Sequence, residues 1–339
     1  MTEPQIWGGL FFILGAIIGS FLNVCIARMP LDQSIVWPGS HCFKCRKPVL
    51  WYDNVPILSW FILGGKCRFC KERFSFRYPL VEFVTACGFL GFYLAFGLTP
   101  LLGAYLVMLG CFIIATFVDW EHKIIPDQIS VGGMFAGLAL SAVIPGLHSA
   151  SFYLISAGRI FMWAVVGICL AAYLASLYYH RATLSKEDMD GEKNFMLLLG
   201  IFLGLEGALA FATNVAKDRA GDGIWPYLLS LDASLIGALV GGGLIYFLGL
   251  LGELMFKKEA MGGGDVKLLA MMGAFLGWKL ALLTFFLAPF FGAVWGIEEK
   301  IRTKESVIAY GPFLVLAAMI SLFMGERIVN WALSGYAIF

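Results

Sequence analysis

Four cysteines form the most specific chemical pattern in the chain. Cys42 and Cys45 make one Cys-x-x-Cys pair, Cys67 and Cys70 make a second, and 21 residues separate the two pairs. Each pair can turn two thiolates toward one point, and four thiolates satisfy tetrahedral zinc. The alternative is a set of unpaired structural cysteines. Because thiolates would fill all four ligand positions and leave none for water, we expect a structural zinc site.

Three aspartates stand at the ends of apolar runs. Asp119 follows the run LGCFIIATFV, and Asp127 closes the same short segment. Asp265 follows three glycines (262–264) where another apolar run begins. Taken singly, Asp119 would cap a membrane span and Asp265 would be a helix N-cap. Ionisable groups near lipid are costly unless they are paired or functional. Glycines let a peptide backbone approach a carboxylate closely. Asp119, Asp265 and the glycines before Asp265 therefore together indicate a functional site.

Two carboxylates brought together suit peptide hydrolysis without a covalent intermediate. Like charges a few ångströms apart cannot both ionise easily, so such a pair shares one proton. The ionised member can take a proton from water, and the protonated member can polarise the scissile carbonyl. The chain contains no GxSxG motif, no HExxH motif and no GxxxxGK[ST] loop, so serine, metalloprotease and nucleotide-binding alternatives have no motif to support them.

The composition requires a membrane to cover the apolar surface. Of the 339 residues, 60% are apolar and 14% are charged, and the mean hydropathy is +0.83. Average soluble domains are about half apolar and about a quarter charged. We therefore expect an all-α polytopic membrane protein with about ten transmembrane or partial helices and no nucleic-acid partner. The apolar runs lie near 5–26, 79–97, 100–118, 128–147, 152–179, 195–213, 227–252, 265–277, 279–297 and 307–325, and the run 265–277 is short enough to be a partial span.

Lysine and arginine residues set the expected orientation. Residues 27–78 carry nine of them, and if this loop is cytoplasmic, alternation places 19 of the 24 basic residues on the inner side. Asp119 and Asp265 then share the cytoplasmic membrane face. A loop of about fifty residues with few aliphatic side chains rarely folds without an additional cross-link, such as a bound metal. The sequence therefore predicts a small zinc-stapled cytoplasmic loop domain over 27–78.

Several motifs together resemble one family of membrane proteases. In the first third of the chain they are Gly19-Ser-Phe-Leu-Asn-Val24, Arg28-Met-Pro30, the two cysteine pairs, and Phe76-Arg-Tyr-Pro79 with Glu82. Further along they are FVDWEHKIIPD (117–127), GGGDVKLLAMMGAFLGW (262–278) and Tyr310-Gly-Pro-Phe313. In this order they resemble the type IV prepilin peptidases/N-methyltransferases, intramembrane aspartic proteases of the GxGD type.

The resemblance implies a bifunctional enzyme of the bacterial inner membrane. Such enzymes remove the leader of type IV prepilins, or of pseudopilins of type II secretion, at the cytoplasmic face. They then methylate the new N-terminal amine with S-adenosylmethionine. On this resemblance Asp119 and Asp265 are the catalytic pair. We expect prepilins or pseudopilins and membrane lipid as partners, and substrate-positioning roles for Gly262, Gly263, Gly264, Asp127 and Lys267.

No motif locates the methyl donor. The chain has no GxGxxG after a strand, so no cofactor-binding residue is assigned. Polar groups around the first two helices and the cysteine loop are interpreted as interfacial snorkelling and helix–loop bonding; they are Asn23, Arg28, Arg77 and Glu82.

The motifs divide the chain into four expected regions. Residues 1–97 hold the zinc-binding domain and the methyltransferase-associated helices, and 98–147 hold the first catalytic aspartate. Residues 148–232 are an inserted pair of spans of unknown role, and 233–339 hold the second aspartate. Glu206 in the insertion is either a functional site or a polar contact with another helix. A secondary transporter or a membrane-anchored zinc module would each leave some of these motifs unexplained.

Overall fold

The computed structural model describes residues 3–148, 155–167, 200–213, 215, 223–256, 262–303 and 309–334. The regular elements in these ranges are helices, and the extended backbone there forms only two isolated β-bridges. The chain divides into two compact units, which we call the N-terminal unit (Met1–Ile129) and the C-terminal unit (Ser130–Phe339). Each unit has its own helix packing.

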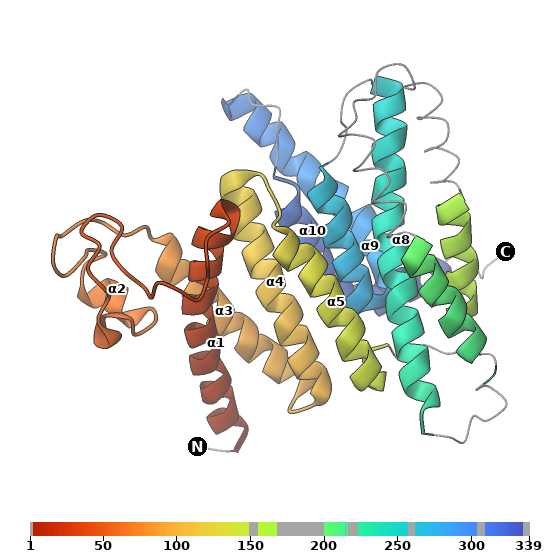
Figure 1. The fold of residues 1–339 in the computed structure, drawn as a ribbon, viewed down its shortest axis with the longest axis horizontal. Helices are drawn as coiled ribbons and strands as arrows, with labels where there is room; N and C mark the ends of the chain where they lie inside the picture. Colours follow the sequence, from red (N-terminus) through yellow and green to blue (C-terminus); the bar gives the residue numbers. More distant parts are fainter. Residues whose placement is uncertain are drawn as a thin grey trace. The chain divides into compact units, whose positions relative to one another are not determined.

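The N-terminal unit is built on three long helices that contact one another (Figure 1). They are α1 (Glu3–Arg28), α3 (Arg77–Phe96) and α4 (Pro100–His122). The long connection between α1 and α3 carries the 3-10 turns Met29–Leu31 and Trp51–Asp53 and the short helix α2 (Leu58–Ile62). This connection contains all four cysteines of the predicted metal site.

Glycines on α1 allow the close packing of α1 against α3. A Cβ atom added at Gly15 would lie 2.7 Å from Cα of Ala86, and one added at Gly19 would lie 2.7 Å from Cα of Glu82. Small residues four apart let two membrane helices approach at backbone distance. The Gly19-Ser-Phe-Leu-Asn motif therefore has a packing role, which brings Asn23 and Glu82 of neighbouring helices to the same end of the pair.

The C-terminal unit contains the remaining long helices. α5 (Asp127–Val143) begins at the end of the N-terminal unit and is followed by two short apolar helices, Ile155–Gly167 and Gly200–Thr213. α8 (Trp225–Phe256), α9 (Gly263–Thr303) and α10 (Gly311–Ser334) complete the unit. α8 packs along α9, and α9 packs on α10 (Figure 1).

α9 is interrupted at Gly277, which has φ 77° and ψ 168°. Only glycine adopts this left-handed backbone without strain. The interruption divides α9 into the two segments that the sequence predicted as separate runs, 265–277 and 279–297. Near the break, the Ser234 hydroxyl of α8 donates a 2.7 Å hydrogen bond to the Ala274 carbonyl. Such side-chain bonds satisfy backbone groups at a helix break, where lipid offers no partner.

The predicted fold class is confirmed: the chain is a helical, multi-pass membrane protein. Six described helices are long and apolar enough to cross a membrane, and three shorter apolar helices accompany them. The runs predicted near 152–179 and 195–213 are described only over Ile155–Gly167 and Gly200–Thr213. The rest of those two runs and the polar segment 180–194 lie outside the described residues.

Candidate functional site

The two cysteine pairs lie in turns of the same geometry. In each turn the N–H of the first cysteine donates to the carbonyl five residues later, at 3.0 Å for Cys42 and 2.8 Å for Cys67. The residue that follows the second cysteine, Arg46 or Lys71, has φ 59° in both turns. Two turns of one shape, each with its two cysteines in the same places, can present four sulfurs to a common centre.

The four sulfur atoms are arranged for a tetrahedral metal. Those of Cys42, Cys45, Cys67 and Cys70 all lie within 4.8 Å of one another. The Cys42–Cys70 sulfur distance is 3.6 Å and the Cys45–Cys67 distance is 4.0 Å. A zinc ion with Zn–S distances of about 2.3 Å needs tetrahedron edges of about 3.8 Å. The cluster could therefore hold zinc with little rearrangement.

Hydrogen bonds around the cluster divide the pKa values of the thiols, and an ion pair joins the two turns. Backbone N–H groups, that of Cys70 first, lower the pKa of Cys67 to about 7. The backbone of Glu72 lowers the pKa of Cys70, but burial and the neighbouring thiols outweigh it and raise that pKa to about 11. Lys44 of the first turn forms an ion pair with Glu72 of the second. Because both of these side chains are substantially exposed, the pair adds orientation more than stability.

A cavity of about 170 Å³ adjoins the cysteine cluster within the N-terminal unit. Its lining includes Asn23 of α1, Glu82 of α3, Asp53, and the cysteines Cys42 and Cys67. Asp53 is held in place by Arg68, whose Nε and Nη2 donate to its two carboxylate oxygens at 2.7 and 2.5 Å. This bidentate contact lowers the pKa of Asp53, so its carboxylate stays charged at neutral pH.

Polar side chains from α1 and α3 fix the loop around this cavity. The Asn23 Nδ2 atom donates to the Tyr78 carbonyl at 3.0 Å, and the Glu82 carboxylate accepts the Ile57 N–H at 2.6 Å. Ile57 has φ 65°, a strained conformation for a β-branched residue. Helix–loop bonding is therefore present at Glu82, whereas Asn23 joins α1 to Tyr78 of α3. The buried Oδ1 atom of Asn23 has no hydrogen-bond partner within the described part of the chain.

Asp119 lies at the carboxyl end of α4 and is buried, with 5% of its surface exposed. The helix ends there because Lys123 adopts the left-handed conformation and its N–H donates to the Asp119 carbonyl at 2.9 Å. An ion pair between Arg77 and Glu121 joins this end of α4 to the start of α3. Asp127 is exposed in the first turn of α5.

Asp265 lies in the first turn of α9 and is half-buried. Its N–H donates to the Gly262 carbonyl at 3.1 Å, so the glycines form the turn that opens the helix. Gly262 and Gly263 are exposed, as is Lys267, and a Cβ atom added at Gly263 would meet no atom within 4 Å. The backbone at Gly263, close to Asp265, is therefore exposed and is not covered by other residues of the protein.

Tyr310 is a neighbour of Asp265 that the sequence analysis did not assign to the site. It immediately precedes α10, and its ring packs 3.4 Å from the Cβ position of Gly292 in α9. Burial raises the pKa of Tyr310 to about 12, and the negative charge of Asp265 adds to this increase. Its place at the head of the Tyr-Gly-Pro-Phe motif was the available signal.

The predicted residues fall into three groups. The four cysteines form one cluster in the N-terminal unit. Asp119 and Asp127 belong to the α4–α5 connection, and Asp265 with its glycines and Lys267 belongs to the start of α9 in the C-terminal unit. Asp119 and Asp265 lie in different units, and their pairing is taken up below as a proposal. Glu206, which the sequence left open, is paired with Arg159 of another helix.

Known proteins match this chain along most of its length. The family model for the bacterial peptidase A24 N-terminal domain matches residues 13–96, and that for the type IV leader peptidase family matches 195–297. A prepilin leader peptidase/N-methyltransferase of Myxococcus xanthus is 33% identical, over 95% of this chain and 92% of the relative. Proteins of the same name from Klebsiella pneumoniae (35% identical, 59% of this chain, 87% of the relative) and Aeromonas salmonicida strain A449 (27%, 98% and 95%) also match. No solved structure matches the chain.

The fold and the motifs define a polytopic membrane protein with one tetracysteine cluster and with carboxylates at helix ends. The chain belongs to the prepilin leader peptidase/N-methyltransferase family. The first family match contains the cysteine cluster, and the second contains Asp265 and the glycines before it.

Proposed function

We propose that this chain removes the leader peptide of type IV prepilins or pseudopilins with Asp119 and Asp265 as the catalytic pair, and then methylates the new N-terminus. The observation that carries the proposal is the similarity to relatives of that name over nearly the whole chain. Two features of the chain support the choice of carboxylates. Asp119 is buried at a helix end, and Asp265 stands behind an open glycine turn.

The proposed hydrolysis needs one proton shared by the two carboxyl groups. The ionised aspartate takes a proton from water as the water attacks the scissile carbonyl, and the protonated aspartate donates to the carbonyl oxygen. The leaving amine then receives a proton from the pair. Tyr310 would support Asp265 as a neutral hydroxyl that can donate a hydrogen bond; burial, and the charge of Asp265 after it, raise its pKa to about 12.

Orientation and location follow from the same assignment. The nine basic residues of the loop 27–78 support a cytoplasmic position for the cysteine cluster, in a protein of the bacterial inner membrane. A prepilin, with a short leader followed by an apolar helix, would then present its cleavage site at that face. Gly262, Gly263 and Gly264 offer a backbone along which the unwound peptide can lie, with Asp127 and Lys267 as exposed polar neighbours.

We assign methyl transfer to the cavity beside the cysteine cluster. S-adenosylmethionine, when bound, would supply the methyl group. The residues present fit such a molecule: Asn23 Oδ1 is a buried acceptor without a partner among the described residues, and the carboxylates of Asp53 and Glu82 line the same cavity. These oxygens can accept hydrogen bonds from ribose hydroxyls and amino groups. Zinc held by the four cysteines would fix the wall of the cavity and would have no open position for catalysis.

Isosteric amides at the two aspartates test the peptidase assignment. Asp119→Asn and Asp265→Asn should each lower leader cleavage by at least about a hundredfold, because an amide cannot exchange the proton. The assay uses the full-length protein in nanodiscs with a full-length prepilin. Retained methyl transfer to a pre-cleaved pilin shows that each variant is folded. Cleavage near the wild-type rate by either variant would refute the pair, and loss in the control Asp127→Asn alone would move the first role to Asp127.

A further inference from the structure

A buried ion cluster joins the two short apolar helices to α8. The Nε atom of Arg159 donates to Glu206 at 2.7 Å, and its Nη2 atom donates to Asp232 at 2.5 Å. Arg159 lies on the helix Ile155–Gly167, Glu206 on Gly200–Thr213, and Asp232 on α8. One guanidinium therefore links three helices.

Arg159 donates to both acids away from water. The side chains of Glu206 and Asp232 are 0% exposed, and that of Arg159 is 15% exposed. The second oxygen of each carboxylate is buried and has no hydrogen-bond partner among the described residues. Buried carboxylates are very costly when they lose their cation. The triad (Arg159, Glu206 and Asp232) thus ties the three helices together through one guanidinium.

The residue beside Arg159 makes a second contact, with α9. A Cβ atom added at Gly158 would lie only 2.4 Å from Nε1 of Trp278, and the ring of Phe161 stacks on Trp278 with centroids 6.0 Å apart. Trp278 directly follows the break at Gly277. Gly158 and Phe161 of the helix Ile155–Gly167 therefore pack against the indole ring of Trp278 at the point where the two segments of α9 meet. We call this contact the Trp278 seat.

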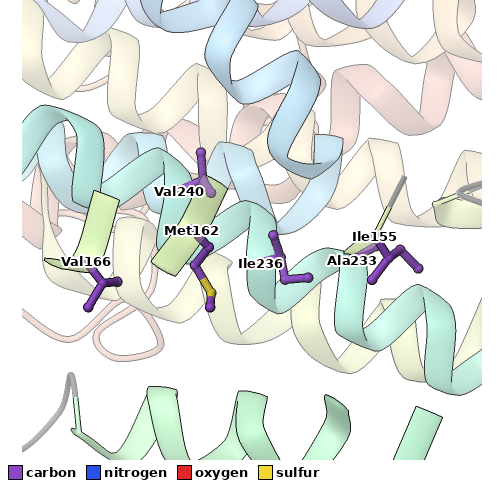
Figure 2. Packing of buried hydrophobic residues seen from close by; sticks show 6 residues of the cluster. All are labelled: Ile155, Met162, Val166, Ala233, Ile236 and Val240. Atoms are coloured by element: carbon purple, nitrogen blue, oxygen red, sulfur yellow. The ribbon is translucent and has the colours of Figure 1, made fainter. Parts of the chain in front are cut away.

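An apolar cluster also packs the helix Ile155–Gly167 against α8. Figure 2 shows three side chains from the helix Ile155–Gly167 and three from α8, all buried: Ile155, Met162, Val166, Ala233, Ile236 and Val240. Partly buried Trp278 of α9 and Leu203 of the other short helix pack against the same cluster. The contact is thus continuous along one face of the helix.

α8 also packs closely against the segment of α9 that carries Asp265. A Cβ atom at Gly237 of α8 would lie 2.1 Å from the carbonyl oxygen of Gly273, and one at Gly241 would lie 2.5 Å from that of Leu269. Small residues at this interface let the two backbones approach closely, so α8 packs tightly on this segment of α9. Asp265 lies thirteen residues before Trp278, which is about 20 Å along a helix at 1.5 Å per residue.

We propose that the two short helices form an intramembrane brace, which holds α8 and the first segment of α9 through the Arg159 triad and the Trp278 seat. This proposal rests on the proposed function in one respect, the catalytic role of Asp265. Arg159 and Gly158 are then positioning residues, since they fix the far end of the segment that presents Asp265. The two short helices, which lie in the region of unknown role, 148–232, would thereby have a positioning role.

Matched alanine variants on one helix test the seat. In Gly158→Ala the added methyl must displace Trp278, whereas in the control Gly167→Ala it would meet no atom within 4 Å. We expect faster hydrogen exchange of residues 263–277 in Gly158→Ala. Leader cleavage should show a kcat lower by about tenfold with KM nearly unchanged, since misplacement of a catalytic group acts mainly on the chemical step. Gly167→Ala should match the wild type in both measurements.

A charge-free variant tests the triad without leaving a buried unpaired charge. Arg159→Met, Glu206→Gln and Asp232→Asn are combined in one chain, and Glu206→Gln alone is the control because one guanidinium still faces one carboxylate. The triple variant should show the faster exchange of 263–277 and the lower kcat, and the control should not. Methyl transfer to a pre-cleaved pilin should stay unchanged in all variants.

Two results would overturn the brace: wild-type exchange over 263–277 in both Gly158→Ala and the triple variant, or equal effects of Gly158→Ala and Gly167→Ala. Failure of the proposed function gives a different pattern. If Asp265→Asn cleaves normally, the catalytic assignment is wrong, and the exchange measurement still decides whether the short helices hold α9.

Discussion

At the scale of single residues, the glycines of the chain differ in whether packing requires them, and the glycine turn before Asp265 is open. Gly263 is exposed, and a side chain added there would touch nothing within 4 Å. By contrast, Gly237 and Gly273 are required by packing, because their added Cβ atoms would overlap backbone oxygens. A glycine that the fold does not require, next to a proposed catalytic carboxylate, is best explained by the approach of a substrate backbone.

We therefore expect Gly263→Val to lower leader cleavage by about tenfold or more while the protein remains folded. The branched side chain would occupy the space along which the peptide is proposed to lie. Cleavage is measured on a full-length prepilin, and thermal unfolding in nanodiscs provides the folding control. Normal turnover by Gly263→Val would mean that the glycines serve only the helix start.

Tyr310 gives a prediction that involves pH. Its pKa is raised to about 12 by burial and by the charge of Asp265, so the hydroxyl stays protonated at any pH well below that value. Tyr310→Phe should lower kcat by about tenfold because it removes the hydroxyl proposed to support Asp265, yet leave the shape of the pH–rate profile between about pH 6 and pH 10 unchanged. If an alkaline limb in that range vanished in Tyr310→Phe, Tyr310 would be the titrating group and its proposed role would be wrong.

At the scale of elements, features with local causes could be predicted from the sequence. Each Cys-x-x-Cys turn is closed by hydrogen bonds within six residues, so its shape is encoded next to the cysteines. The break in α9 was visible as two apolar runs that meet at Gly277. The Arg159 triad was not predictable, because its partners are 47 and 73 residues away and no periodic pattern links them.

The cysteine cluster predicts that the protein contains zinc. The full-length protein should bind about one zinc per chain, and Cys67→Ser should release it, because the loss of one thiolate opens the tetrahedral site. Elemental analysis of the purified protein measures the metal. Cys87→Ser is the matched control, since Cys87 is exposed on α3 and lies outside the cluster. Active protein that contains no zinc would contradict the structural role.

At the scale of the whole molecule, the two proposed reactions use the two units differently. The cavity assigned to methyl transfer lies entirely in the N-terminal unit, together with the cysteine cluster. The proposed peptidase pair takes Asp119 from the N-terminal unit and Asp265 from the C-terminal unit. The two activities should therefore be separable by mutation, although both belong to one chain and act on one substrate.

Asn23 provides the test of this separation. Asn23→Ala removes the buried Oδ1 acceptor that lines the cavity, and we expect methyl transfer to a pre-cleaved pilin to fall by about tenfold or more. S-adenosylhomocysteine should raise the thermal unfolding temperature of the wild type and of Asp265→Asn, but raise that of Asn23→Ala less, because a ligand stabilises only the fold that binds it.

Leader cleavage by Asn23→Ala should stay within about twofold of the wild type, since the change lies outside the carboxylate pair. Parallel loss of cleavage and methyl transfer in Asn23→Ala would show that the N-terminal unit acts as one site, and an unchanged response to S-adenosylhomocysteine would place the methyl donor elsewhere.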